Sequence, residues 1–178
     1  MPLDATVGGT TANSYVTLDE AVAYMETNLY AASWLDLDSD VQEQTLMMAT
    51  RQLDTLCFLG QKATAAQALK WPRTGLVSDG YPVPSDVIPM AIKIATCEQA
   101  RVVAGRDTTA QSDAEVQGLE KIKAGSVELV FKEGGSSSGK SVPPTVSNGI
   151  PLAWQCPTAE TLAALDAANK RKAQFAVI

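Results

Sequence analysis

Apolar residues return at steps of three and four between Ser39 and Gly60, with polar residues on the other side of the same helical wheel. This period predicts an α-helix with one buried and one solvated face. Ser39 can cap the helix start, with Gln42 three residues later in a capping-box arrangement. Gly60 stands just past the last periodic residue and is suited to end the helix. The apolar face would comprise Leu46, Ala49, Leu53, Leu56 and Cys57.

Two further helices are predicted on either side of this one. The first opens at Thr17, which forms a capping box with Glu20, and runs to about residue 28. Trp34, in the connector that follows, is expected to pack back on the bundle. The third helix begins near Pro89 and ends at Gly105, and its residues are apolar on most sides. Such a helix either lies at the centre of the bundle, which we favour, or packs one face against another subunit.

A smaller amount of β-structure is predicted. Asp79-Gly80 is a strong turn signal inside a Gly/Pro/Asp loop and marks the tip of a small hairpin. Residues 126–132 have the composition of a strand, and the piece before them, to about Lys123, is predicted to be a short helix or irregular. The fold class predicted is therefore mainly α: a small helical bundle with a minor β element and an extended C-terminal arm.

The chain divides at a Gly/Ser-rich stretch. Residues 1–132 would form the helical body, and residues 133–178 a flexible linker followed by an arm with a short helix that opens at Thr158. Residues 145–157 are expected to be extended, because their apolar positions alternate. Apolar groups on an arm with little core of its own indicate a partner surface. The interface candidates are Ile150, Leu152, Trp154, Leu162, Leu165, Phe175 and Ile178, with Trp154 as the anchor.

The loop Leu69-Lys-Trp-Pro-Arg-Thr-Gly75 is the other feature singled out by the sequence. Pro72 has a fixed φ and favours an extended conformation at Trp71. We expect Trp71 to cover the open end of the helix bundle. Arg73 either pairs with a buried carboxylate or makes a surface contact, and the sequence leaves both open.

The charge is acidic and unevenly placed. The 178 residues include 20 acids and 14 bases, and residues 1–89 hold 11 of the acids and 4 of the bases. A dedicated nucleic-acid binder normally has a basic face, so this balance argues against one and predicts weak binding to single-stranded DNA. No apolar run reaches the length of a membrane span and no leader pattern is present, so neither membrane insertion nor secretion is expected.

The chain contains no histidine. This excludes Ser-His-Asp and Cys-His catalytic sets and the usual zinc sites, so we expect no enzyme, no cofactor and no metal. The three cysteines, Cys57, Cys97 and Cys156, are far apart and odd in number. They are predicted to be small buried hydrophobes in a reducing compartment.

Two motifs imitate binding sites. The segment 134–141 fits the phosphate-binding loop pattern letter for letter, but Pro143 and Pro144 follow at once and prevent the helix that such a loop requires. The alternating acids at 36, 38 and 40 resemble the start of a calcium loop. Val41 and Met47 stand where that loop needs Gly and Glu. We interpret the first as a linker and the second as acids that favour a helix start.

Four segments together resemble one family of phage and prophage proteins, whose members are described either as "DnaT-like" or as head-to-tail adaptor (connector) proteins. They occur in the family's order within about residues 12–132, and the chain from Glu133 onward matches nothing that we can place. The segments are Ala12-Asn-Ser-Tyr-Val-Thr-Leu-Asp-Glu-Ala21, Ala49-Thr-Arg-Gln-Leu-Asp54, Leu69-Lys-Trp-Pro-Arg-Thr-Gly75 and Ile88-Pro-Met-Ala-Ile92.

Of the two descriptions, the sequence favours the head-to-tail adaptor, since the chain lacks a catalytic set of residues and ends in an apolar arm. The resemblance then implies a structural virion protein at the head–tail junction, made in the host cytoplasm and forming a homo-oligomeric, dodecameric ring under the portal. Its partners would be the portal protein, other copies of itself and a tail or tail-terminator (nozzle) protein. DNA would pass through without sequence-specific binding, and no membrane would be involved. The alternative is a single-stranded-DNA-binding replication accessory protein, which would need a basic groove with exposed aromatics.

Overall fold

The computed structural model describes residues 1–105, 121–124, 127–130, 142, 144–147 and 149–157. The helices are α1 (Leu18–Met25), α2 (Ala32–Leu35), α3 (Ser39–Leu53), α4 (Met90–Gly105), α6 (Pro144–Ser147) and the 3₁₀ helix η1 (Leu152–Trp154). The strands are β1 (Gln61–Lys62), β2 (Arg73–Thr74), β3 (Val77–Ser78), β4 (Tyr81–Pro82), β5 (Lys121–Ala124) and β6 (Val127–Val130). Within the described residues the strands pair in sequence order as three two-stranded antiparallel sheets.

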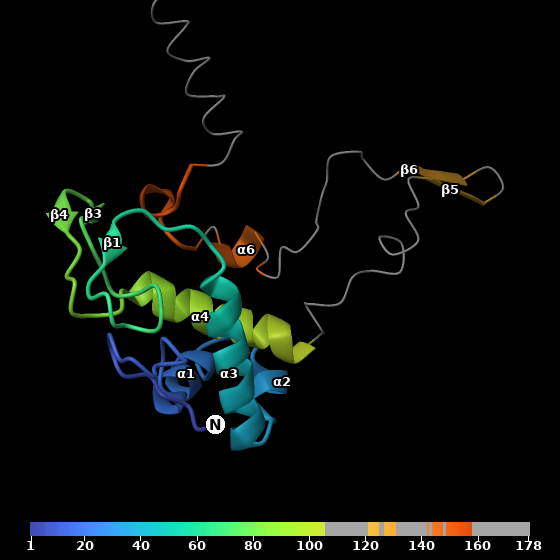
Figure 1. Ribbon diagram of the computed structural model, residues 1–178. Helices are drawn as coiled ribbons and strands as arrows, with labels where there is room; N and C mark the ends of the chain where they lie inside the picture. The colour runs from blue at the N-terminus through green and yellow to red at the C-terminus, as the bar shows by residue number, and fades with distance from the viewer. Residues whose placement is uncertain (106–120, 125–126, 131–141, 143, 148, 158–178) are drawn as a thin grey trace, which may run out of the picture.

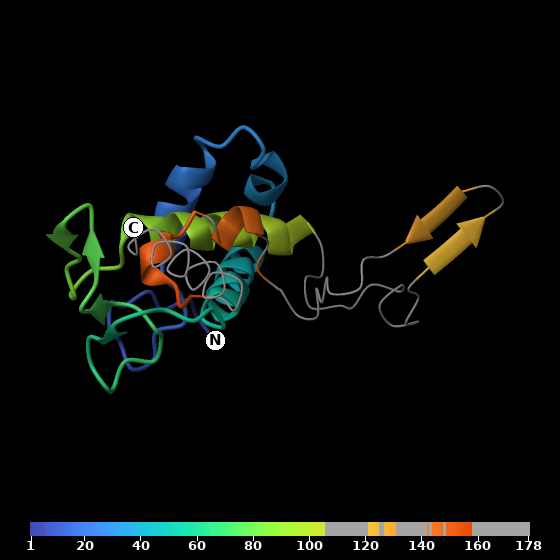
Figure 2. The same cartoon turned by 90° about the horizontal axis from the view of Figure 1, so that it is seen from above.

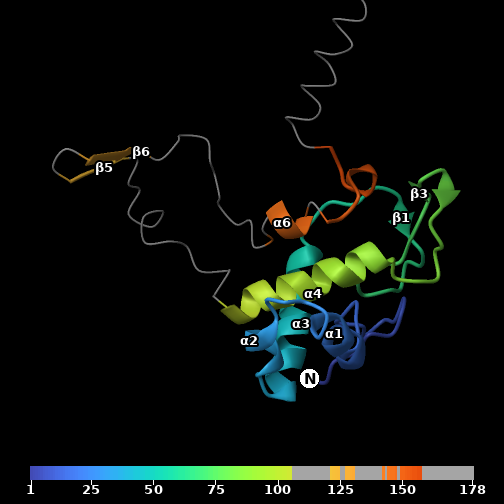
Figure 3. The same ribbon diagram turned by 180° about the vertical axis from the view of Figure 1, so that it is seen from behind.

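Helix α4 is the centre of the bundle (Figure 1). It packs against α1, α2, α3 and α6, and α3 is its main partner. Seen from above, α1 and α2 lie on one side of α4 and α3 lies on the other (Figure 2). The view from behind shows α6, β1 and β3 at the opposite end of the body from α1 and α2 (Figure 3). The mainly α fold class and the central position of this apolar helix are both confirmed.

The core has two parts. In the first, Trp34 and Leu46 are fully buried among α1, α2, α3 and α4, and the Trp34 indole Nε1 donates to the Thr45 hydroxyl at 2.8 Å. Trp34 therefore packs back on the bundle as predicted. The second part lies on the other side of α3 and α4, where large apolar residues from the loops meet the two helices. It comprises Tyr15, Leu53, Phe58, Trp71, Leu76, Ile88, Ile92, Ala95, Val142, Val146, Ile150 and Trp154.

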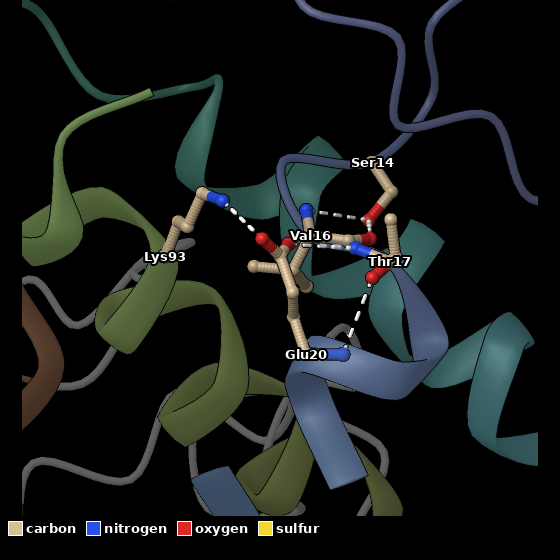
Figure 4. A network of polar contacts seen from close by, with 5 residues as sticks. All are labelled: Ser14, Val16, Thr17, Glu20 and Lys93. Atoms are coloured by element: carbon tan, nitrogen blue, oxygen red, sulfur yellow. Dashed lines mark hydrogen bonds and ion pairs between the residues drawn. The ribbon is translucent and has the colours of Figure 1, made fainter. Parts of the chain in front are cut away.

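The capping box predicted at α1 is present (Figure 4). The Glu20 N–H donates to the Thr17 hydroxyl at 3.2 Å, and the Thr17 N–H donates to the Glu20 carboxylate at 3.2 Å. The same carboxylate forms an ion pair with the Lys93 ammonium of α4. The chain that enters α1 is braced by Ser14, whose hydroxyl donates to the Val16 carbonyl at 2.7 Å. The capping box thus begins α1, and its Glu20 also connects α1 to α4.

The boundaries of α3 differ from the prediction. Ser39 is the first helical residue, Asp38 occupies the cap position, and no side-chain cap hydrogen bond is formed there. The helix ends at Leu53, well before Gly60. The reason is tertiary, because side-chain donors from the following loop take carbonyl groups that a longer helix would use.

The β-structure also corrects two predictions. The hairpin tip at Asp79-Gly80 is confirmed, with both residues at positive φ between β3 and β4. The piece before residue 126, expected to be helical or irregular, contains strand β5, which pairs with β6 because one strand needs a partner. Residues 145–157, expected to be extended, contain α6 and η1. Alternation over so few residues does not distinguish a strand from short helical turns.

Leu46 tests the energetics of the first core part. Leu46→Ala should lower the free energy of unfolding by about 2–5 kcal/mol, because it removes a fully buried side chain from a packed core. Urea denaturation of the full chain, followed by circular dichroism, measures this loss. Leu29→Ala is the matched control, since Leu29 is 84% exposed, and it should change stability by less than about 0.5 kcal/mol. Equal effects at the two sites would contradict the core assignment.

Candidate functional site

Charge is partitioned sharply along the folded chain. Residues 1–57, which include α1, α2 and α3, carry nine acids and a single base. Residues 58–81 carry three bases, Lys62, Lys70 and Arg73, and one acid, Asp79. We call residues 58–81 the loop layer. It contains β1, β2, β3 and the start of β4, and it covers the second core part. The loop layer is therefore basic on a protein whose helical side is strongly acidic.

Arg73 organises the loop layer. Its side chain is 8% exposed, and its guanidinium donates to four backbone carbonyls. Nε reaches the Leu59 oxygen at 2.7 Å, and one terminal nitrogen reaches the Lys70 oxygen at 3.1 Å. The other terminal nitrogen reaches the oxygens of Phe58 at 3.1 Å and Gly60 at 2.7 Å. Burial lowers the pKa of Arg73 from its ordinary value, yet a guanidinium stays charged in proteins.

Neither role that the sequence left open for Arg73 is the observed one. Its contacts are to carbonyl oxygens, which any residue carries, so no acceptor could be identified from side-chain types. The planar fork of five N–H donors suits this task because several carbonyls can be bound at once. The bound segment, residues 58–60, crosses the layer between the end of α3 and β1.

A second set of contacts holds the middle of the loop layer. Strands β1 and β2 pair Lys62 with Arg73. Gln67 is 2% exposed and donates to the oxygens of Leu69 at 2.9 Å and Pro72 at 3.0 Å. The Lys62 ammonium lies 3.0 Å from the Gln67 carbonyl. These contacts fold residues 61–74 into a closed loop, in which Lys62 is exposed, Lys70 is half-buried and Arg73 is buried.

The loop layer is attached to the helices through Asp54. Its carboxylate accepts from the backbone N–H of Lys70 at 3.1 Å and from the hydroxyl of Tyr15. Burial raises the pKa of Asp54, and burial together with the neighbouring carboxylate raises the pKa of Tyr15. The Lys70 ammonium donates to the Leu56 carbonyl at 2.7 Å. These bonds explain why α3 stops at residue 53.

The exposed face of the layer is apolar and aromatic. Tyr81 is 76% exposed and Val77 is 54% exposed, and both lie in the β3–β4 hairpin. Leu59 is 40% exposed, and Lys62 is exposed on β1. The layer thus carries an exposed ring on β4 and an exposed lysine on β1. Such groups can contact a nucleobase and a phosphate, so the layer offers a candidate interface for nucleic acid.

The structure places the residues singled out by sequence mostly in the core. Trp71 is 1% exposed and packs in the second core part, with Pro72 buried beside it after a cis peptide bond. Ile150 is fully buried and Trp154 is 5% exposed, so both pack in the body. An anchor for a partner must be exposed, and these two are not. Their burial was missed because it depends on aromatic partners far away in sequence.

The structure does not describe the side chains of the remaining interface candidates on the arm. Leu152 lies in η1, and only its backbone is described. The phosphate-loop look-alike at 134–141 and four interface candidates lie outside the described residues: Leu162, Leu165, Phe175 and Ile178. The division at residue 133 stays a prediction.

The cysteines need a correction. Cys57 and Cys156 form a disulfide with a Cα–Cα distance of 5.4 Å, across a sequence separation of 99 residues. Cys97 alone fits the prediction of a buried thiol, and burial raises its pKa to about 12. A pairing over such a separation cannot be deduced from the sequence alone.

The described residues contain no cluster of three or more histidine, cysteine or acidic side chains that could hold a metal ion. Asp36, Asp38 and Asp40 do not come together in such a cluster. Of the helices that the structure describes, none combines the length and apolar character of a membrane span.

The fold and the loop layer define a small, mainly α protein whose loop layer carries an exposed lysine, Lys62, and an exposed ring, Tyr81. Over residues 1–162 the chain matches the family described as "Putative DnaT-like ssDNA binding protein", and it belongs to that family. No curated protein and no solved structure matches the chain.

This membership overturns the head-to-tail adaptor interpretation. The family is described by binding to single-stranded DNA, so the portal and tail partners, the ring, the virion location and the passive passage of DNA are all corrected. The alternative drawn from the sequence, a DnaT-like protein, is the better supported one. The error came from the charge of the whole front half, which concealed the basic loop layer inside it.

Arg73→Lys tests the organising role of the guanidinium. A lysine has a point charge without the planar fork, so several of the four carbonyls should lose their donor. We expect a loss of at least about 2 kcal/mol in the free energy of unfolding, since hydrogen bonds to charged groups contribute about 1.5–3 kcal/mol each. Arg51→Lys is the control because Arg51 is exposed on α3. An unchanged stability in Arg73→Lys would contradict the role.

Gly60 and Gly75 form a second matched pair. Both have positive φ, 73° and 78°, so alanine is strained at either site. At Gly60 an added Cβ would stand 2.3 Å from the Thr74 carbonyl oxygen, whereas at Gly75 it would meet nothing within 4 Å. Gly60→Ala should therefore lower the melting temperature clearly more than Gly75→Ala. Differential scanning calorimetry measures both melting temperatures. Equal decreases in the two variants would show that the close contact between Gly60 and the Thr74 carbonyl does not matter for stability.

Proposed function

We propose that this protein binds single-stranded DNA through the loop layer, as a non-catalytic accessory protein of DNA replication. The observation that carries the proposal is the family match over residues 1–162. In the loop layer three bases stand against one acid, and the layer also carries an exposed ring, Tyr81.

Tyr81 supplies the stacking surface. Its ring is 76% exposed on β4, directly after a tight turn that holds the hairpin tip. A base can lie against such a ring whatever its identity, because every base has a π-face. Val77 pairs with Pro82 in the same hairpin and widens the apolar surface. Binding of this kind is largely independent of sequence.

Lys62 supplies the phosphate contact. Its side chain is exposed, and its ammonium has three donors, of which contacts to the carbonyls of Gln67 at 3.0 Å and Ala68 at 3.4 Å engage two. The third is left for a phosphate oxygen. Lys70 is half-buried with its ammonium on the Leu56 carbonyl, so it contributes mainly to the local potential.

The proposal involves no reaction. The chain has no histidine for a nucleophilic set, and the loop layer is built from backbone carbonyl contacts. No cofactor is needed to bind a strand through stacking and phosphate contacts.

Tyr81→Ala tests the stacking surface. We expect the Kd for an oligothymidylate of about 30 nucleotides, longer than the 4–16 nucleotides that one binding fold covers, to rise between about fivefold and 100-fold. Fluorescence anisotropy at about 150 mM salt measures it. Tyr30→Ala is the control, since Tyr30 is 75% exposed on the acidic side, and its Kd should stay unchanged.

Lys62→Gln tests the proposed phosphate contact independently, through the salt dependence of binding. One lost contact should reduce the slope of log K against log salt by about 0.7, the value for single strands. Arg51→Gln, an exposed base on α3, should leave the slope as it is. Absence of saturable binding by the wild-type chain would refute the function, and equal effects of Tyr81→Ala and Tyr30→Ala would refute its location.

A further inference from the structure

A short C-terminal segment lies across the loop layer. We call residues 149–157 the strap. The strap pairs with the start of the layer through an antiparallel bridge between Phe58 and Gln155. The Leu59 N–H donates to the Trp154 carbonyl at 2.8 Å, and the Cys156 N–H donates to the Cys57 carbonyl at 3.1 Å. The disulfide between these cysteines closes the same contact covalently.

The strap inserts one aromatic ring into the layer. The Trp154 indole lies against Trp71, with ring centroids 5.5 Å apart and an interplanar angle of 54°. Phe58 contacts the Trp71 ring edge-on, also at 5.5 Å. The Trp154 Nε1–H donates to the Val77 carbonyl at 3.2 Å. Trp154 thus occupies a slot formed by an aromatic wall and a backbone acceptor.

An indole and a purine base have much in common. Both are flat fused bicyclic rings, and both present N–H donors at an edge. A base in this slot would pack against the Trp71 ring and donate to the Val77 carbonyl, as the tilted Trp154 ring does. The Trp71 Nε1–H is itself buried without an acceptor among the described residues, and an acceptor atom on a base would satisfy it.

The slot adjoins the proposed DNA-binding face. Val77, whose carbonyl closes the slot, lies in the same hairpin as Tyr81. Leu59, bonded to the Trp154 carbonyl, is two residues from β1, which carries Lys62. Both elements that carry the proposed DNA contacts, the β3–β4 hairpin and β1, are therefore connected to the slot.

We propose that the Trp71 slot is a second base-binding site of the DNA interface, that Trp154 fills it as an internal mimic of a base, and that reduction of the Cys57–Cys156 disulfide releases the strap. This inference rests on the proposed function. Its ligand is a nucleobase of single-stranded DNA, and its regulator is a dithiol reductant.

The chemistry of release balances with the dithiol as the co-reactant. A thiolate of the dithiol attacks one sulfur of the disulfide, forms a mixed disulfide, and expels the other cysteine as a thiolate. The second thiol of the reagent then attacks the mixed disulfide, so the reagent becomes a cyclic disulfide and both cysteines become thiols. Cys57 is exposed and Cys156 is half-buried, so the bond is open to attack.

The strap is built to open at one end. Ile150 is fully buried in the body, which holds the near end in place. The Gln155 side chain donates back to the Ser147 and Ile150 carbonyls at 2.9 and 2.8 Å, so the turn retains internal bonds. The far end is held by the disulfide together with the two backbone hydrogen bonds between the strap and residues 57–59. Without the disulfide, Trp154 remains tethered beside the slot and competes with a base as an intramolecular ligand.

The decisive experiment compares oxidised and dithiothreitol-reduced full-length protein. Anisotropy titrations use an oligonucleotide of about 30 nucleotides, and we expect reduction to lower the Kd about tenfold, a factor within the range of one stacked base. Trp154→Ala should bind with the tighter Kd even when oxidised, because its slot is empty. Cys97→Ser retains the disulfide and should behave as wild type in both states.

Two further measurements test the disulfide without DNA and check that every form of the protein is folded. Alkylation followed by mass spectrometry should label no cysteine in native oxidised protein and two after reduction, because Cys97 is 2% exposed. Thermal melts confirm that each form is folded at the assay temperature. Free thiols at Cys57 and Cys156 in oxidised protein would overturn the proposal that a disulfide holds the strap.

The outcomes separate this inference from the proposed function. Equal Kd values for oxidised and reduced wild type, with saturable binding in both, would overturn the slot and leave DNA binding standing. Absence of binding in every form, including reduced protein and Trp154→Ala, would overturn the proposed function itself. A redox effect that persists unchanged in Trp154→Ala would show that the strap acts without the slot, and would overturn the base-mimic assignment.

Discussion

One guanidinium holds together the loop layer, the part of this protein that we propose contacts DNA. The loop layer has little regular structure, since its strands are only two residues long, so its backbone carbonyls need donors from elsewhere. Arg73 serves four of them while 8% exposed. Leaving such groups buried and unpaired would cost about 1–3 kcal/mol each. Residues 58–60 therefore keep one path, and the Phe58 and Trp71 rings keep their positions beneath it.

Local signals in the sequence predicted local structure well. The capping box at Thr17 and the turn at Asp79-Gly80 depend on residues within a few positions, and both form as expected. The central helix was also predictable, because apolar residues on most sides require burial on most sides. The end of α3 was not, since its periodic pattern continues to Leu56 although Asp54 and Lys70 divert the chain.

The partners of the candidate site residues could be identified only from the folded structure. Backbone carbonyl acceptors have no signature in the sequence, so the role of Arg73 could not be read from it. Trp154 reads as an exposed anchor on a linker until Trp71, more than eighty positions earlier, is brought beside it. Cys57 and Cys156 likewise meet only through the packing of the strap on the loop layer. For the tryptophans and the cysteines the partner is distant along the chain, and a local sequence pattern does not indicate such a pairing.

The net charge of −6 is a poor guide to what this surface binds. At physiological ionic strength, exposed charges separated by more than about 8 Å are largely screened from one another. A phosphate at the loop layer therefore responds chiefly to Lys62, Lys70 and the few charges near them. The acidic helical side then acts in a different way, by repelling the strand from surfaces that offer no stacking ring. Under the proposed function, an acidic protein whose loop layer offers a lysine and an exposed ring binds a single strand in one place and remains free of it elsewhere.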